Sequence, residues 1–445
     1  MENSSTRTAN GEEADMETPP AARAAAPGRQ RWLRLIPIVF VTYSLAYLDR
    51  SNFSIAVAGG MSQDLHLTGT TSGLIGASFF AGYFLLQVPG VLYADRHSVR
   101  SLIFCSVLAW GFLATLQGLL TSVTALIVVR FLLGAVEAAV LPALVVLLAR
   151  WFTKPERGRA NAFLILGNPV TVMWLSALSG YLIEATSWRW MFIIEGIPAV
   201  IWAFHFRAQV HDRPADARWL DPDERDAVDH AIAAEQAELA QTLETGERHP
   251  LAEALRSRTV LLLSAQYLLW SIGVYGFVFW LPSIVKSGSS AGIGATGLLS
   301  AIPYAFAVVA MLLNSRSSDR TRYRKRYVWP WLLGGAVTFY GSYLAGHDAF
   351  WLSFPLLVLA GIAMYAPYGP FFALVPELLP RRTAGVAVAL VNSAGALGGF
   401  VGTYLVGWLR TATGTDGAAF LMLAGTMAAS ALILLPVRSP KRTVV

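Results

Sequence analysis

The sequence has little cysteine and little charge, and each shortage excludes a class of protein. The single cysteine, Cys105, cannot form an intrachain disulfide, and one thiol makes neither a metal cluster nor a redox pair. The seven histidines show no H-E-x-x-H spacing, and no lysine follows a glycine, so a zinc-protease motif and an ATP-binding P-loop are both absent. Charged residues make up 14% of the chain, against about 25% in a soluble domain. We therefore expect no enzyme, no metal and no ATP-driven pump.

The charge that is present is concentrated in two stretches. Residues 1–34 include ten charged side chains and residues 208–258 include eighteen, so 28 of the 62 charges lie in 85 residues. The other 360 residues contain 23 basic and 11 acidic side chains. Because these basic residues interrupt apolar runs and do not line one polar surface, they are typical of a membrane protein with basic loops. We expect no nucleic-acid partner.

Apolar runs of about twenty residues, the length that crosses a lipid bilayer, occur twelve times. Six precede the charged stretch 208–258 and six follow it. Their approximate bounds are 35–57, 71–93, 102–120, 125–148, 160–183, 190–206, 260–285, 294–313, 328–345, 353–376, 384–409 and 418–435. The sequence therefore predicts an all-α integral membrane protein with twelve transmembrane helices.

These runs divide the chain into five parts. We expect a disordered cytoplasmic tail (1–34), an N-terminal six-helix bundle (35–207), a cytoplasmic linker (208–258), a C-terminal six-helix bundle (259–437) and a short cytoplasmic tail (438–445). The first tail lacks the pattern of a signal peptide. In the linker, Asp221 and Pro222 are good residues for a helix start, and they predict a polar helix that ends near Leu243.

The basic residues of the short loops predict the orientation in the membrane. Fourteen of them lie in loops on the side shared with both termini, whereas only Arg189, Lys286 and Arg410 lie on the opposite side. Cytoplasmic loops have an excess of Lys and Arg. Both termini are therefore expected in the cytoplasm.

The two halves also share a charge pattern in the loop after their second apolar run. Asp95, Arg96 and Arg100 in the first half correspond to Asp319 and Arg320 in the second, where further basic residues follow at 324–326. Together with a shared Ala-to-Asn spacing at the start of the fifth run of each half, this pattern indicates a duplicated bundle.

This loop resembles the signature of the major facilitator superfamily, G-x-x-x-D-[RK]-x-G-x-[RK]-[RK]. The match is partial, because Val91 and Ser98 replace the two glycines and Ser101 replaces the last basic residue. The resemblance implies a major facilitator fold of two pseudo-symmetric six-helix bundles. It also implies a conformational gate made by Asp95, Arg96, Arg100, Asp319 and Arg320.

Within that superfamily, the run Tyr47-Leu48-Asp49-Arg50-Ser51-Asn52 resembles the anion:cation symporter family, which includes bacterial sugar-acid and aromatic-acid permeases. Arg130 with Gly134 and Glu137, and the run Glu-Arg-Gly-Arg-Ala at 156–160, also match. The resemblance covers roughly residues 31–437. It implies a substrate cavity lined by Tyr47, Tyr83, Asn168, Tyr275, Phe372 and Asn392.

Independently of the resemblance, five ionisable residues lie well inside apolar runs. They are Asp49, Arg50, Arg130, Glu137 and Glu195, all in the first half. Each costs several kcal/mol in a bilayer and is a functional candidate for that reason. Arg50 and Arg130 lie at similar depths and could grip one carboxylate together, since the guanidinium fork matches carboxylate geometry. The alternative is a pair of buried ion pairs that stabilise helix packing, and for Glu195 we favour a structural hydrogen bond.

The two remaining acids suggest how a proton could be coupled to the substrate. Ionised Asp49 and Glu137 would neutralise the two arginines, and protonation of either acid would leave an arginine free for an anion. Proton and anion would then favour each other's binding. Glu137 is the preferred coupling site because it lies two helical turns from Arg130, and Asp49, adjacent to Arg50, is the second.

We therefore expect a proton-coupled symporter of the bacterial inner membrane that imports a small organic anion by alternating access. A sugar acid such as an aldonate is the first choice of substrate, and an aromatic carboxylate is the second. The proton is the coupling ion, no cofactor is expected, and the protein should be a monomer. One alternative is a drug:proton antiporter, although the run 160–183 lacks the G-x-x-x-G-P-x-x-G-G pattern of that branch. A membrane-bound receptor or enzyme is a weaker alternative.

Overall fold

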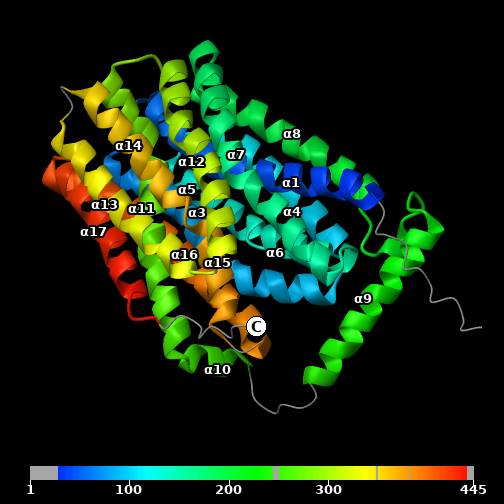
Figure 1. The fold of residues 1–445 in the computed structure, drawn as a ribbon. Helices are drawn as coiled ribbons and strands as arrows, with labels where there is room; N and C mark the ends of the chain where they lie inside the picture. The colour runs from blue at the N-terminus through cyan, green and yellow to red at the C-terminus, as the bar shows by residue number, and fades with distance from the viewer. Residues whose placement is uncertain (1–28, 244–249, 347–348, 380, 438–445) are drawn as a thin grey trace, which may run out of the picture.

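The computed structural model describes residues 29–243, 250–346, 349–379 and 381–437. Within these residues every regular element is a helix (Figure 1). Eleven helices of the described chain, counted across local breaks, are long and apolar enough to cross a membrane. The predicted all-α membrane fold is confirmed. Most of the predicted N-terminal tail (1–28) and the predicted C-terminal tail (438–445) lie outside the described residues.

The first half of the chain forms the first six predicted spans. Its elements are α1 Arg29–Ala56, the π-helical turn η1 Val57–Met61, α2 Ser62–Asp64, α3 Gly69–Arg96, α4 Val99–Gln117, α5 Val123–Glu137, α6 Val140–Trp151, α7 Lys154–Ala185 and α8 Trp188–Gln209. Helix α1 begins six residues before the apolar run, and α7 begins with a capping box in which Thr153 and Glu156 satisfy each other's backbone.

The fourth span is broken, and the break positions a buried acid. Helix α5 ends at Glu137 and α6 begins at Val140. Pro142 lacks an N–H for the carbonyl of Ala138, and a proline ring clashes with the carbonyl four residues earlier. Glu137 is therefore the last residue of α5, immediately before this break.

The second half forms the other six predicted spans. Its elements are α11 Arg258–Ser289, α12 Ile293–Thr321, the 3₁₀ turn η3 Arg324–Tyr327, α13 Trp329–Leu344, α14 Phe350–Tyr365, α15 Tyr368–Glu377, α16 Arg381–Thr413 and α17 Gly417–Leu434. Helix α13 occupies the place of the predicted span 328–345 but has only 16 residues. At 1.5 Å per residue it is about 24 Å long, shorter than the roughly 30 Å bilayer core, so it is not among the eleven long helices. It packs between α14 and α17.

Three helix pairs join the halves: α7 with α12, α3 with α16, and α1 with α11. We call the end of the bundle that contains the α6–α7 loop and the linker the linker side, and the opposite end the far side. Glycines bring the pairs together on the far side. A Cβ added at Gly407 of α16 would overlap the carbonyl oxygen of Gly69 of α3, and a Cβ at Gly297 of α12 would overlap that of Ser176 of α7. The halves are therefore in backbone contact at the far side.

The linker between the halves contains the 3₁₀ turn η2 Pro214–Asp216, α9 Pro222–Leu243 and α10 Pro250–Arg256. The predicted polar helix is present in α9. Helix α9 runs along the outside of the bundle and α10 lies at the same end, where it packs against α16 (Figure 1).

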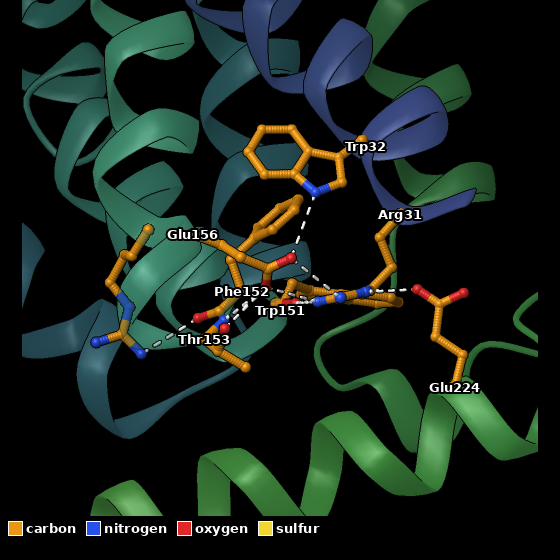
Figure 2. A network of polar contacts seen from close by, with 8 residues as sticks. Arg31, Trp32, Trp151, Phe152, Thr153, Glu156 and Glu224 are labelled. Atoms are coloured by element: carbon orange, nitrogen blue, oxygen red, sulfur yellow. Dashed lines mark hydrogen bonds and ion pairs between the residues drawn. The ribbon is translucent and has the colours of Figure 1, made fainter. Parts of the chain in front are cut away.

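Helix α9 is anchored to the first half through a buried arginine. Figure 2 shows Arg31 of α1 between two carboxylates, Glu224 of α9 and Glu156 of α7. The Nε of Arg31 donates to Glu224 at 2.7 Å, its Nη2 donates to Glu156 at 3.3 Å, and its Nη1 donates to the carbonyl of Trp151 at 2.7 Å. The side chain of Arg31 has no exposed surface. These bonds explain why α1 begins before the apolar run.

Two further contacts hold the linker in place. Glu235 of α9 accepts a hydrogen bond from Arg157 at 3.0 Å, and Trp219 stacks on Trp151 with ring centres 5.5 Å apart. The described part of the linker up to Leu243 is therefore docked on the first half.

Candidate functional site

A buried ion pair joins the first and fourth spans. The Nη2 of Arg50 on α1 lies 3.1 Å from Oε2 of Glu137 on α5. The Glu137 side chain is fully buried and that of Arg50 is 10% exposed. The other oxygen of Glu137 and the Nε of Arg50 have no hydrogen-bond partner in the structure. Both members of the pair therefore keep unused capacity to bind another polar group.

Three aromatic rings surround the guanidinium group of Arg50. Its central carbon lies 4.7 Å from the ring centre of Tyr47, 4.8 Å from that of Tyr83 and 5.0 Å from that of Phe79. Such contacts stabilise a cation without neutralising it. The structure thus brings together Arg50, Tyr47 and Tyr83, which the sequence assigned to one cavity.

Arg130 lies beside this pair but has a different environment. Its Nη1 donates to the backbone carbonyl of Asp49 at 3.0 Å, and its guanidinium lies over the rings of Phe53 at 4.6 Å and Phe79 at 5.2 Å. In the described part of the chain no carboxylate forms an ion pair with it, and its Nε is unpartnered. The ring of Phe79 therefore separates two arginines, one neutralised by Glu137 and one not.

The two other buried acids form a separate chain of hydrogen bonds. The Nδ2 of Asn52 donates to Oε2 of Glu195 at 3.0 Å and to Oδ1 of Asp49 at 3.5 Å. Ser179 of α7 donates to the other oxygen of Glu195 at 2.6 Å. Glu195 of α8 thus links three helices, which agrees with the structural hydrogen bond expected for it. The carboxylate of Asp49 faces Asn52 and makes no ion pair with its sequence neighbour Arg50.

Gly134 lies between Arg130 and Glu137 on α5 and allows a close helix contact. A Cβ at this position would overlap the backbone carbonyl oxygen of Phe79 on α3. The space left by Gly134 is therefore filled by a neighbouring helix, and the same contact places Phe79 between the two arginines.

The remaining predicted cavity residues are distributed over both halves. Asn168 is half-buried on α7, and its Oδ1 has no partner. Tyr275 of α11 lies across the interface between the halves, with its ring 4.6 Å from that of Phe80 on α3. Phe372 of α15 packs edge-on against Tyr267 at 5.2 Å. Asn392 is half-buried on α16. The structure does not join these four to the Arg50 cluster by a direct bond, and their role stays a prediction.

Comparison with known proteins identifies the family. The sequence profile described as the Major Facilitator Superfamily matches residues 39–403. The chain belongs to the Major Facilitator Superfamily. It is a multi-pass membrane transporter and not an enzyme, and the predicted resemblance to this superfamily is confirmed.

The chain is similar to transporters with different named substrates. It is 32% identical to a protein named a putative tartrate transporter of Agrobacterium vitis, over 92% of this chain and 93% of that one. It is 30% identical to a quinolone resistance transporter of Acinetobacter baumannii, over 88% and 91%. It is 26% identical to a D-galactonate transporter of Escherichia coli O6:H1, over 88% and 92%.

Solved structures of the superfamily share the fold. A bacterial homologue of the human lysosomal transporter Spinster, in an inward-facing and unoccupied conformation, matches with a TM-score of 0.72 and 18% identity, over 92% of this chain and 95% of that one.

The residues predicted to form the superfamily gate lie in separate local networks. The guanidinium of Arg100 donates to the carbonyl of Arg207 within the first half, at 2.8 Å from Nε. Asp319 pairs with Arg324, which also pairs with Glu377 at 3.1 Å within the second half. Arg320 is exposed. The side chains of Asp95 and Arg96 lie outside the described residues, and the gate stays a prediction.

Three residues that had no role assigned from the sequence complete this cluster. Phe79 lies between the arginines, and Asn52 and Ser179 hold Glu195. Phe79 precedes Tyr83 by four residues on one helix face, so the spacing could have indicated it. Asn52 follows Asp49 by three residues on the same face, but Ser179 has no signal in the sequence, because only the packing of α7 on α8 brings it to Glu195.

Proposed function

We propose that this transporter is a proton-coupled symporter that imports a small carboxylate, with a sugar acid such as an aldonate as the first choice and an aromatic carboxylate as the second. The observation that supports it best is the buried Arg50–Glu137 ion pair, which lies under three aromatic rings and beside the un-neutralised Arg130. The names of the tartrate and galactonate relatives support the same substrate class.

Charge balance explains how a proton admits an anion. The transmembrane interior of the first half contains three acids, Asp49, Glu137 and Glu195, and two arginines, Arg50 and Arg130. With every group ionised the cluster has a net charge of −1, which opposes the approach of an anion. A proton on Glu137 ends its ion pair with Arg50. The carboxylate of a substrate then takes the place of Glu137, since a bidentate arginine–carboxylate pair suits the guanidinium geometry.

The contacts between the halves support transport by alternating access. The backbones of α3 and α16 touch at Gly69 and Gly407, and Thr70 N donates to Thr411 Oγ1 at 3.0 Å, both at the far side. We infer that this conformation is closed at the far side. With the basic loops in the cytoplasm, the far side faces the periplasm of a bacterial inner membrane, and separating this contact would admit substrate from outside.

Drug export is the second candidate, because one relative is named a quinolone resistance transporter. One feature of the chain argues against it. Residues 167–170 read Gly-Asn-Pro-Val and do not continue into the paired glycines of the antiporter pattern.

Uptake into right-side-out vesicles tests the proposal. Labelled tartrate, galactonate and glucarate should accumulate when the outside is acidified, and a protonophore should abolish the accumulation. A sodium gradient without a proton gradient is the control and should give no accumulation. Uptake that follows sodium, or proton-driven efflux of a fluorescent quinolone with no carboxylate uptake, would overturn the symporter assignment.

A further inference from the structure

A cavity with polar and apolar walls opens at the far side between the two halves. Its volume is about 470 Å³, which is in the range of small-ligand sites. Its walls come from the end of the first span, the start of α3, the end of α11 and the end of α16. Hydroxyl groups and two basic side chains line it: Ser62, Thr68, Ser72, Ser283, Lys286 and Arg410. No acidic residue is among the residues that line it.

The two basic side chains differ in how far they are neutralised. Arg410 forms an ion pair with Asp416 at 2.6 Å and lies over the ring of Trp280 at 4.8 Å. The ammonium of Lys286 donates to the backbone carbonyl of Ala291 at 2.6 Å, and no carboxylate of the described chain pairs with it. An ammonium group has three donors. Lys286 therefore lines the cavity with no carboxylate of the described chain in contact and with donors to spare.

The few basic residues on the far side are unevenly distributed. Only Arg189, Lys286 and Arg410 are basic in the far-side loops, and two of the three line this one cavity. Arg189 is used elsewhere, because it donates to the carbonyl of Leu120 at 2.8 Å at the end of α4. Two of the three basic side chains of the far side thus lie where the two halves meet.

The floor of the cavity is the contact between the halves. Gly69 and Thr411 line the cavity and also take part in the α3–α16 contact, where Thr70 N donates to Thr411 Oγ1. An anion held here would lie directly above the point at which the halves must separate.

We propose that this cavity is an anion-capture vestibule, in which Lys286 attracts small carboxylates to the closed far side before the halves open. The proposal rests on the proposed carboxylate import for the identity of the ligand, but the positive field of the vestibule does not depend on it. Clefts lined by one sign of charge raise the local concentration of oppositely charged ligands and their association rates.

Thiol labelling tests the positive electrostatic field of the vestibule and does not require transport. Ser287 is exposed and lines the cavity. In a Cys105→Ser background, Ser287→Cys should react at least about fivefold faster with the anionic sulfonatoethyl methanethiosulfonate than with its cationic trimethylammonioethyl analogue, each rate corrected for that reagent's rate with a free thiol. Adding Lys286→Gln should bring the two rates within about twofold, whereas Lys286→Arg should preserve the difference.

Thr124→Cys is the matched control, since Thr124 is exposed at the far side and is not among the residues that line the cavity. Its two rates should be similar and should not respond to Lys286→Gln. Equal rates at Ser287→Cys, or a difference that survives Lys286→Gln, would overturn the vestibule.

Uptake kinetics then connect the vestibule to transport. With a carboxylate that the protein transports, Lys286→Gln should raise KM about threefold at low ionic strength and leave kcat unchanged, and high salt should abolish the difference. An unchanged KM at low salt would overturn the capture role. Failure of all carboxylate uptake would instead overturn the proposed function, and the labelling result would still decide whether the field exists.

Discussion

Glu137 occupies a position that a coupling acid requires, because it is the carboxylate that neutralises Arg50. Asp49 and Glu195 are equally buried, but their carboxylates accept from Asn52 and Ser179 and pair with no arginine in the described chain. A proton on Glu137 therefore frees a cation, whereas a proton on Glu195 changes only a structural hydrogen-bond network.

We predict that Glu137→Gln, which mimics the protonated acid, keeps substrate-for-substrate exchange and loses accumulation driven by a proton gradient. Counterflow and gradient-driven uptake in proteoliposomes measure the two activities side by side. Glu195→Gln is the matched control, since its amide oxygen can still accept from Ser179 or Asn52, and it should accumulate substrate. A Glu137→Gln protein that concentrates substrate against its gradient would refute the assignment. Asp49→Asn should also impair transport.

Substrate affinity should depend on the planar shape of the Arg130 guanidinium group as well as on its charge. We predict that Arg130→Lys lowers substrate affinity at least tenfold, about 1.4 kcal/mol or more. A lysine ammonium cannot donate to the Asp49 carbonyl and also lie flat on Phe53 and Phe79 as the planar guanidinium does. Calorimetric titration with the transported carboxylate measures the loss. Arg189→Lys, on the far side, should bind normally, and a normal affinity in Arg130→Lys would remove Arg130 from the site.

At the scale of residues, the sequence predicts which residues belong to the candidate site better than it predicts which of them are in contact. An ionisable group inside an apolar run is identified by its cost alone. The spacing of seven places Arg130 and Glu137 on one face of one helix, yet the partner of Glu137 is Arg50. That pairing depends on how α1 lies against α5, and no spacing within one helix encodes it.

At the scale of elements, the sequence predicts that a linker helix forms but not where this helix docks. Asp221 and Pro222 predict a helix start, and α9 begins at Pro222. Its docking could not be predicted, because Glu224 and Arg31 lie 193 residues apart in the chain. Pro142 marks the break of the fourth span, but by hydropathy alone residues 125–148 form one uninterrupted apolar run.

We predict that Glu224→Gln destabilises the folded protein. The change weakens a charge-assisted hydrogen bond to a fully buried arginine, and a bond of this kind contributes about 1.5–3 kcal/mol. Thermal unfolding of the purified protein in detergent should show a lower Tm. Asp223→Asn, at the exposed neighbouring position, is the control and should unfold like the parent. Equal Tm values for the two variants would show that α9 is not held by Arg31.

For the whole molecule, the number and order of the spans follow from hydropathy, whereas the relative position of the halves does not. Charge counts predict the linker side as the basic side, and the twelve apolar runs all correspond to helices, including the short α13. The far-side contact depends on how the surfaces of the two halves pack against each other. It depends on glycines such as Gly69 and Gly407, which a single sequence shows only as small residues in apolar runs.

That contact makes the conformational equilibrium testable with one substitution. We predict that Gly407→Leu shifts the protein toward conformations that are open at the far side, because the new side chain cannot fit against the carbonyl oxygen of Gly69. In a Cys105→Ser background, Ser72→Cys reports the change, since Ser72 is only 2% exposed beside this contact. Its reaction with a membrane-impermeant thiol reagent should become at least about tenfold faster, and transport should slow because closure is impeded.

Gly425→Leu is the matched control, because a Cβ at Gly425 meets no atom within 4 Å. If Gly407→Leu leaves Ser72→Cys as protected as Gly425→Leu does, the α3–α16 contact is not what closes the far side.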